Sequence, residues 1–223
     1  MANKVTTKVQ LKGGAEIGPV SDINIEQRID WHHTFQFSVK SEEKLDILLQ
    51  KTQEYIGKEI EIQIDSPKAS GGNDFVFKGI ITNLGFSNYL GGTHELVFEG
   101  FSPTILLDDG PATRSFTDKK LKQIVEDTMK PMQPFLSKKK IAPELGDLLP
   151  YIVQYEESNY HFLSRLAMRY GEWFFYDGEQ LVYGKLPSGN TEVIEYGTNI
   201  SSCLLYTSPS PRDRTRSRMP SSA

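Results

Sequence analysis

Short segments in which apolar and polar residues alternate fill most of the first hundred residues. A period of two is typical of strands that bury one face. Several such strands at short spacing, with one helix among them, favour a small closed barrel or roll. The segments are marked by Val5, Thr7, Val9 and Leu11; Ile23, Ile25, Gln27 and Ile29; Phe35, Phe37 and Val39; Ile60, Ile62 and Ile64; Phe75 and Phe77; Ile80–Tyr89; and His94–Phe101.

One helix is predicted within this β region. Ser41 can cap its start, and Gly57 can end it. The loop Ser66–Asp74 and a tight turn at Gly91–Gly92 connect strands on either side. The apolar face of the helix is expected to consist of Leu45, Leu48, Leu49 and Thr52.

The pattern changes after Ser102. A helix is predicted to begin at Thr117–Asp118 and to stop at Pro131 and Pro134. Residues 135–150 have no clear period, and the lysine run Lys138–Lys140 is expected to be solvated surface. The apolar face of this helix is expected to be Leu121, Ile124, Val125 and Met129.

A strand, a helix and a hairpin are predicted next. The strand is Tyr151–Tyr155, Ser158 caps the helix, and Gly171 ends it. Two aromatic-rich strands then flank Asp177–Gly178, a pair typical of a type I′ hairpin turn. The apolar helix face is Phe162, Leu163, Leu166, Ala167 and Tyr170, and the last predicted strand is Glu192–Tyr196.

Composition and charge exclude several classes of protein. The chain has 223 residues, of which 38% are hydrophobic and 24% charged, and no stretch has the roughly 18 consecutive apolar residues of a membrane helix. The N-terminus lacks the apolar region of a signal peptide. A single cysteine excludes a disulfide framework, and no histidines and cysteines have zinc-site spacing. The net charge of −4 argues against nucleic-acid binding.

The last 21 residues differ abruptly from the rest of the chain. The segment from Cys203 to Ala223 contains four arginines and three prolines and has no amphipathic period. It resembles the translation of a transposase-type sequencing-library adapter, the alternative being a disordered basic tail. We therefore expect the native sequence to end near Ser202, within a longer gene, and residues 203–223 to pack against nothing.

An ordered set of motifs fills the stretch from Gln154 to Leu186: a strand, an acidic–Ser turn, a Phe-Leu-x-Arg-Leu helix, a glycine and an aromatic hairpin. This set resembles the signature of VgrG proteins, the spike proteins of type VI secretion systems, which are related to the hub of phage baseplates. Upstream, Gly79, Phe98–Gly100, Ser102–Pro103 and Arg114–Phe116 fit the family's spacing. The motif positions, expected to be structural, are Ser158, Phe162, Leu163, Arg165, Leu166, Gly171, Trp173, Phe175, Gly178 and Gly184.

The resemblance implies a mainly β fold with short helices, built from two related β-barrel domains of the phage-hub type. Residues 1–105 would be the first barrel, 106–150 a helical or irregular connection, and 151–202 the start of an incomplete second barrel. VgrG chains continue into an OB-fold domain and a β-helical needle, which this sequence lacks.

By the same resemblance, the function is structural and needs no cofactor. Three chains with two barrels each would adapt a hexameric tube to a trimeric spike. The implied partners are two further copies of the chain, a tube protein of the Hcp type, and spike-tip and effector proteins bound through the missing C-terminal parts. The protein would be cytoplasmic before firing and then injected. A phage-like particle hub and a particle-associated hydrolase are the alternatives.

No set of residues has the spacing of a catalytic or metal site. The pair His32–His33 has no third ligand, and His161 is expected to be a partly exposed helix residue. Glu156 and Glu157 should point to opposite faces of a strand, so they are poor acid–base partners. Ser158 lacks a nucleophile elbow.

Two further segments of the motif region leave alternatives open. Arg165 either pairs with a carboxylate or extends to solvent. The aromatic run Trp173–Tyr176 offers apolar side chains to both faces, which indicates burial or an interface.

Overall fold

A computed structural model describes residues 6–41, 54–65, 75–88, 94–136 and 138–186. The chain divides into two units, Met1–Leu186 and Pro187–Ala223, and only the first contains described residues. The predicted helix face Leu45–Thr52, the loop Ser66–Asp74, the Gly91–Gly92 turn, the strand Glu192–Tyr196 and the segment 203–223 therefore lie outside the described residues.

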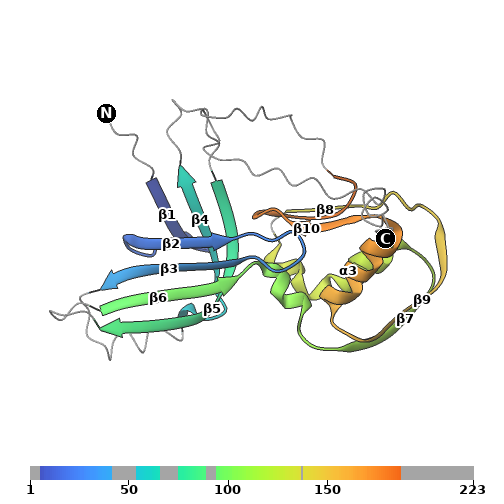
Figure 1. Ribbon diagram of the computed structural model, residues 1–223, viewed down its shortest axis with the longest axis horizontal. Coiled ribbons are helices and arrows are strands. Elements are labelled where there is room, and N and C mark those ends of the chain that lie inside the picture. The colour runs from blue at the N-terminus through green and yellow to red at the C-terminus, as the bar shows by residue number, and fades with distance from the viewer. Residues whose placement is uncertain (1–5, 42–53, 66–74, 89–93, 137, 187–223) are drawn as a thin grey trace, which may run out of the picture. The chain divides into compact units, whose positions relative to one another are not determined.

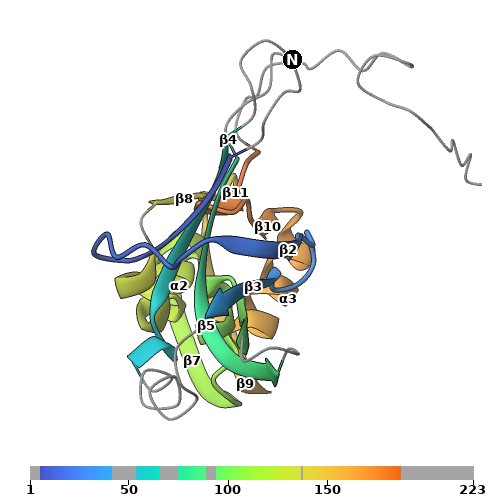
Figure 2. The same cartoon turned by 90° about the vertical axis from the view of Figure 1, so that its left-hand side faces the viewer.

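The first part is a six-stranded antiparallel sheet in the order β1-β4-β5-β6-β3-β2 (Figure 1). The predicted strands at Phe75 and Ile80 are one long strand, β5, which bends along the sheet (Figure 2). The strands are β1 (Thr6–Leu11), β2 (Val20–Glu26), β3 (Thr34–Ser41), β4 (Glu59–Asp65), β5 (Phe75–Asn88) and β6 (His94–Phe101).

The sheet curls around an apolar core, as the alternation predicts, but it stays open between β1 and β2. The free edge of β1 is occupied by the turn that follows it, because Ile17 N donates to Val9 O (2.9 Å) and Leu11 N donates to Ala15 O (2.8 Å). The sheet is therefore a roll. β2 ends at Glu26, and Ile29, which the alternation places in this strand, is 59% exposed.

Two glycines at the resemblance positions make room for one core aromatic ring. A Cβ atom on Gly79 would lie 2.6 Å from the Phe35 ring, and one on Gly100 would lie 2.5 Å from that ring and 2.0 Å from Ile80 O. Contacts this short do not occur, so any side chain at these two positions would displace Phe35, which is buried.

The second part comprises residues 103–136 and 138–186. These described residues form two small sheets and two α-helices. β7 (Ala112–Lys120) pairs with β9 (Leu148–Glu157), and the order β10-β11-β8 gives the other sheet. The remaining elements are η2 (Pro103–Leu107), α2 (Leu121–Thr128), η3 (Lys130–Phe135), β8 (Lys138–Ala142), α3 (Asn159–Tyr170), β10 (Trp173–Tyr176) and β11 (Gln180–Gly184).

The mainly β fold class is confirmed, but the content of residues 106–150 differs from the prediction. The helix expected at Thr117 begins at Leu121, because β7 continues its pairing with β9 as far as Lys120. The predicted face of α2 is correct: Leu121, Ile124, Val125 and Met129 have no exposed surface.

The stretch predicted to be irregular, 135–150, contains β8, which pairs in parallel with β11. Lys138 and Lys139 are exposed, as expected of a lysine run, yet their backbone belongs to a sheet edge. Lysines on an edge strand discourage pairing with other chains. The domain boundaries at 105 and 150 stay a prediction.

Candidate functional site

The motif helix α3 begins and ends at the predicted residues. Ser158 has extended backbone, and its Oγ accepts a hydrogen bond from His161 N (3.2 Å), which satisfies one free donor of the first turn. Gly171 adopts the left-handed conformation (φ 71°) that ends helices. Phe162, Leu163 and Leu166 are fully buried between these two ends.

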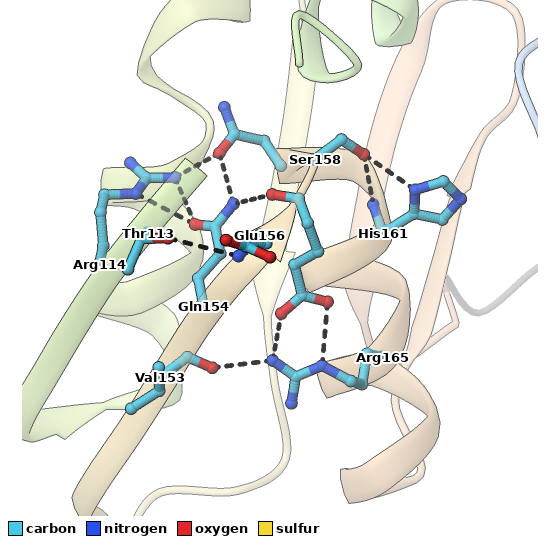
Figure 3. Close-up of polar contacts among 10 residues, drawn as sticks. Thr113, Arg114, Val153, Gln154, Glu156, Ser158, His161 and Arg165 are labelled. Atoms are coloured by element: carbon cyan, nitrogen blue, oxygen red, sulfur yellow. Dashed lines mark hydrogen bonds and ion pairs between the residues drawn. The ribbon is translucent and has the colours of Figure 1, made fainter. Parts of the chain in front are cut away.

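A polar network joins β7, β9 and the start of α3 (Figure 3). The Arg114 Nε donates to Gln154 Oε1 (3.0 Å), and its Nη2 donates to the same oxygen (2.7 Å) and to Asn159 Oδ1. Gln154 is fully buried, and its Nε2 donates to Glu157 O (2.9 Å) and Asn159 Oδ1 (3.2 Å). Both ends of this buried amide are therefore satisfied within the protein.

Arg165 pairs with a carboxylate, that of Glu157, and is not a side chain that simply extends to solvent. Its Nη2 lies 2.5 Å from Glu157 Oε1, its Nε donates to Glu157 Oε2 (3.1 Å), and Nη2 also donates to Val153 O (2.8 Å) (Figure 3). The hydrogen bonds to Glu157 raise the pKa of the Arg165 guanidinium. This two-pronged pair holds the middle of α3 against the end of β9.

Glu156 and Glu157 lie in different surroundings, as expected of poor acid–base partners, although β9 is irregular at this point. Glu157 is turned to Arg165, whereas Glu156 is exposed and its backbone N–H donates to Thr113 Oγ1 (3.3 Å). Glu156 has a positive φ of 47°, and the register of β7 and β9 shifts between Ala112 and Arg114. This irregularity re-aims the end of β9 into the capping turn of α3.

The aromatic hairpin forms as predicted, but its turn is displaced by one residue. Asp177 N donates to Gln180 O (3.0 Å), which places Gly178 and Glu179 at the centre of the turn. Only Gly178 has positive φ (111°), so the turn is of the type with glycine first, not type I′. The Asp177 carboxylate fixes the turn by accepting from Glu179 N (2.9 Å) and Gln180 N (2.6 Å).

The hairpin turn contacts the first sheet. Gly178 O accepts from Lys78 N (2.7 Å), and Asp177 O accepts from Gln27 Nε2 (3.1 Å). A Cβ atom on Gly178 would lie 3.0 Å from Val76 O. The glycine therefore allows the turn to lie against the backbone of β5.

The run Trp173–Tyr176 is less buried than a strand covered on both faces. Trp173 is 45% exposed, Phe174 and Phe175 are half-buried, and Tyr176 is buried. β10 is also an edge strand. Gly184, the last motif position, has φ 115°, and a Cβ atom there would lie 2.1 Å from Ala142 O, so β8 approaches it closely.

His161 lies near a serine and an aspartate without forming a catalytic triad. His161 Nδ1 is 3.0 Å from Ser158 Oγ and 3.9 Å from Asp108 Oδ1. A triad needs its serine and its carboxylate on opposite ring nitrogens, whereas here both lie at Nδ1. Ser158 Oγ is also occupied as the helix cap.

His32 and His33 are buried, and each lies within hydrogen-bond distance of a neighbouring loop or helix. His32 Nδ1 lies 2.9 Å from Thr104 Oγ1, and His33 Nε2 lies 3.1 Å from Arg28 O. Burial lowers the pKa of both imidazoles. Across the described residues, no group of three potential ligands could hold a metal ion, and no helix is long and apolar enough to span a membrane.

The sequence did not indicate Gln154, Asn159 or Asp108 as parts of this junction. Each is an ordinary polar residue without a local pattern. Asn159 begins α3 itself, Gln154 lies in β9, and Asp108 follows η2. Arg114 belonged to a stretch with the family's spacing, but its partners could not be named from that spacing.

Comparison with known families decides the identity of the chain. The family of the phage tail baseplate hub (GPD) matches residues 31–199. This range includes β3 to β6 of the first sheet and both sheets of the second part. The chain belongs to the phage tail baseplate hub family. No curated protein sequence matches the chain.

Solved structures show that this hub fold occurs in phage tails and in type VI secretion. A 43 kDa tail protein of prophage MuSo2 from Shewanella oneidensis is 18% identical, with a TM-score of 0.62 over 82% of this chain and 54% of that one. The c3393 protein of E. coli, described as a type VI secretion component, is 13% identical, with a TM-score of 0.60 over 79% and 48%.

The Francisella PdpA–VgrG complex contains a further chain with this fold, at 12% identity and a TM-score of 0.58 over 82% of this chain and 31% of that one. The hub chain spans about half the length of the first two of these relatives. At such identities the likeness concerns the fold alone.

The double-mutant cycle of Arg165 and Glu157 tests the network. We expect Arg165→Met and Glu157→Gln to show a coupling free energy of about 1 kcal/mol or more in the free energy of unfolding, since Glu157 is only 20% exposed and the pair is bidentate. The control pair is Lys185–Glu144, at 3.4 Å and 72% and 67% exposed, for which we expect less than about 0.5 kcal/mol. Equal coupling in the two pairs would contradict a stabilising role for Arg165.

Proposed function

We propose that this chain is the structural hub part of a contractile injection particle, where it adapts a hexameric tube to a trimeric spike. The observation that carries the proposal is the hub family match across residues 31–199. The motif positions Ser158, Arg165, Gly171, Gly178 and Gly184 support it, because each caps, pairs or spaces a backbone element and none is left to act on a substrate.

A mechanical role requires rigid junctions, and the motif segment supplies them. The Arg165–Glu157 pair ties α3 to β9, and the Gly178 turn ties the aromatic hairpin to β5. The hairpin turn thus joins the second part to the first sheet through a direct backbone hydrogen bond, as a hub that transmits force would require. Ser158 Oγ lies beside His161 Nδ1, but it accepts the capping hydrogen bond of α3, and Asp108 lies at the same ring nitrogen. This arrangement does not favour a particle-associated hydrolase.

The particle is either a secretion system or a phage-like tail. The family match and the MuSo2 relative favour the phage-like tail, and the c3393 and Francisella relatives favour secretion. Neighbouring genes separate these two: tube, sheath and AAA ATPase genes would indicate secretion, and capsid genes a phage.

The proposed partners follow from the hub role. They are two further copies of the chain, a tube protein of the Hcp type, and tip or effector proteins bound through C-terminal parts of the whole protein. The proposed location is the cytoplasm before firing, followed by ejection with the spike.

Light scattering on the product of the complete gene tests the assembly. We expect a mass of three chains for the complete protein, and a monomer or aggregate for residues 1–202, because open sheet edges such as β10 are not covered there by partner chains. A complete protein that is monomeric would contradict the hub role. A clean trimer from residues 1–202 would place the trimer contacts in the barrels.

A further inference from the structure

A buried histidine lies at the point where three segments of the hub meet. His32 follows the turn after β2 and is 1% exposed. Its Nδ1 lies 2.9 Å from Thr104 Oγ1 in η2, and Thr104 Oγ1 lies 2.6 Å from Ser102 Oγ. Its Nε2 has no hydrogen-bond partner among the described residues.

The group facing Nε2 is a carboxylate slightly too distant for a hydrogen bond. Asp108 follows η2, and its Oδ2 lies 3.6 Å from His32 Nε2. The other carboxylate oxygen, Oδ1, lies 3.9 Å from His161 Nδ1 in the first turn of α3. Asp108 therefore stands between one buried and one exposed imidazole.

Aromatic rings close the space around His32. Its ring centroid lies 4.3 Å from that of Tyr160 and 4.9 Å from that of Trp31. Trp31 also contacts Tyr160 edge-on (5.5 Å) and His161 (5.8 Å). The loop at 31–32 is thus packed on α3 by ring contacts and on η2 by one hydrogen bond.

The charged and titratable groups around His32 come from all three segments: Asp108 after η2, Tyr160 and His161 in α3, and Arg28, Asp30 and His33 in the loop. Burial lowers the pKa of His32 despite the opposing effect of Asp108. Burial also raises the pKa of Tyr160 to about 12, so this phenol stays neutral. His32 is consequently uncharged at neutral pH.

We propose that His32 makes this junction acid-sensitive: protonation at Nε2 puts a charge into a buried position with no hydrogen-bond partner among the described residues, and the loop at Trp31–His32 then separates from η2 and the start of α3. A solvated histidine binds a proton with a pKa near 6.5, and the packed His32 binds it more weakly. The open form therefore takes up the proton preferentially, so the packed form is favoured above pH 6.5 and weakens as the pH falls below it.

Trp31 reports the opening directly. The chain has two tryptophans, so Trp173→Phe leaves Trp31 as the single indole. In the full chain with this change, we expect Trp31 fluorescence to shift toward solvent-exposed emission on acidification, with a midpoint below pH 6.5. His32→Asn keeps an amide near Thr104 but does not titrate, and should abolish the transition.

Three further variants keep the proposal falsifiable even where His32→Asn fails to fold. Asp108→Asn removes the carboxylate that favours the charged imidazole, so the midpoint should fall by about one pH unit. His161→Gln, at an exposed position 3.9 Å from Asp108, and His33→Gln, on the other side of the loop, should keep the transition. A transition that persists in His32→Asn, is lost in His33→Gln, or has a midpoint raised by Asp108→Asn would overturn the proposal.

Discussion

Replacing Phe162 with alanine is expected to lower the free energy of unfolding by about 3–5 kcal/mol, the usual cost of removing a phenyl ring from a packed core. Phe162 has no exposed surface, and its ring stacks on that of Phe116 at 5.8 Å and an interplanar angle of 10°. The Arg165 guanidinium also lies over the Phe162 ring, 5.4 Å from its centroid. The ring therefore supports both the core of the second part and the Arg165–Glu157 pair.

Met168→Ala is the matched control on the same helix. Met168 is 80% exposed, so its removal should change the free energy of unfolding by no more than about 0.5 kcal/mol. Urea denaturation of the three proteins measures both effects. A loss below about 1 kcal/mol for Phe162→Ala would mean that α3 is not packed as described.

Gly184→Ala is expected to cost at least about 3 kcal/mol, because two effects add. The residue has φ 115°, where side chains are strained by about 1–3 kcal/mol, and the new Cβ atom would lie 2.1 Å from Ala142 O. Relief of that overlap requires β8 to move away from β11, which breaks the parallel pairing of these two strands.

Gly110→Ala separates strain from overlap, since Gly110 has the same φ of 115° and nothing within 4 Å of its Cβ position. We expect it to lose only the strain energy. Hydrogen exchange at Lys185 N, which donates to Ala142 O (3.1 Å), should become faster in Gly184→Ala alone. Equal destabilisation in both variants would show that the contact with β8 contributes nothing.

The features that the sequence predicted well are those with local causes. The cap at Ser158 and the stop at Gly171 depend on the side chain and backbone of single residues, and the face of α3 depends on helical spacing. The alternation in β1 to β6 likewise reports burial of one face. Each of these signals is complete within about ten residues.

The features that the sequence missed depend on pairing between distant segments. β8 has three consecutive lysines and becomes a strand only because β11, about forty residues later, pairs with it. β7 extends past Thr117 for the same reason, through its pairing with β9. Local propensity cannot reveal such contacts.

The candidate site was predictable only where its features have local causes. The spacing of Phe162, Leu163 and Leu166 indicated core positions, whereas the partner of Arg165 became clear only once the bend at the end of β9 turned Glu157 toward α3. The displaced hairpin turn is similar, because the Asp177 carboxylate, which accepts two backbone hydrogen bonds, selects Gly178–Glu179 over Asp177–Gly178.

The stoichiometry of the complex with the tube protein tests the proposed hub role. The product of the complete gene should be mixed with the tube protein encoded beside it, and the mass of the complex measured by native mass spectrometry. We expect three hub chains bound to six tube subunits. A hub protein that binds no tube, or that binds as a single chain, would contradict a role in joining a hexameric tube to a trimeric spike.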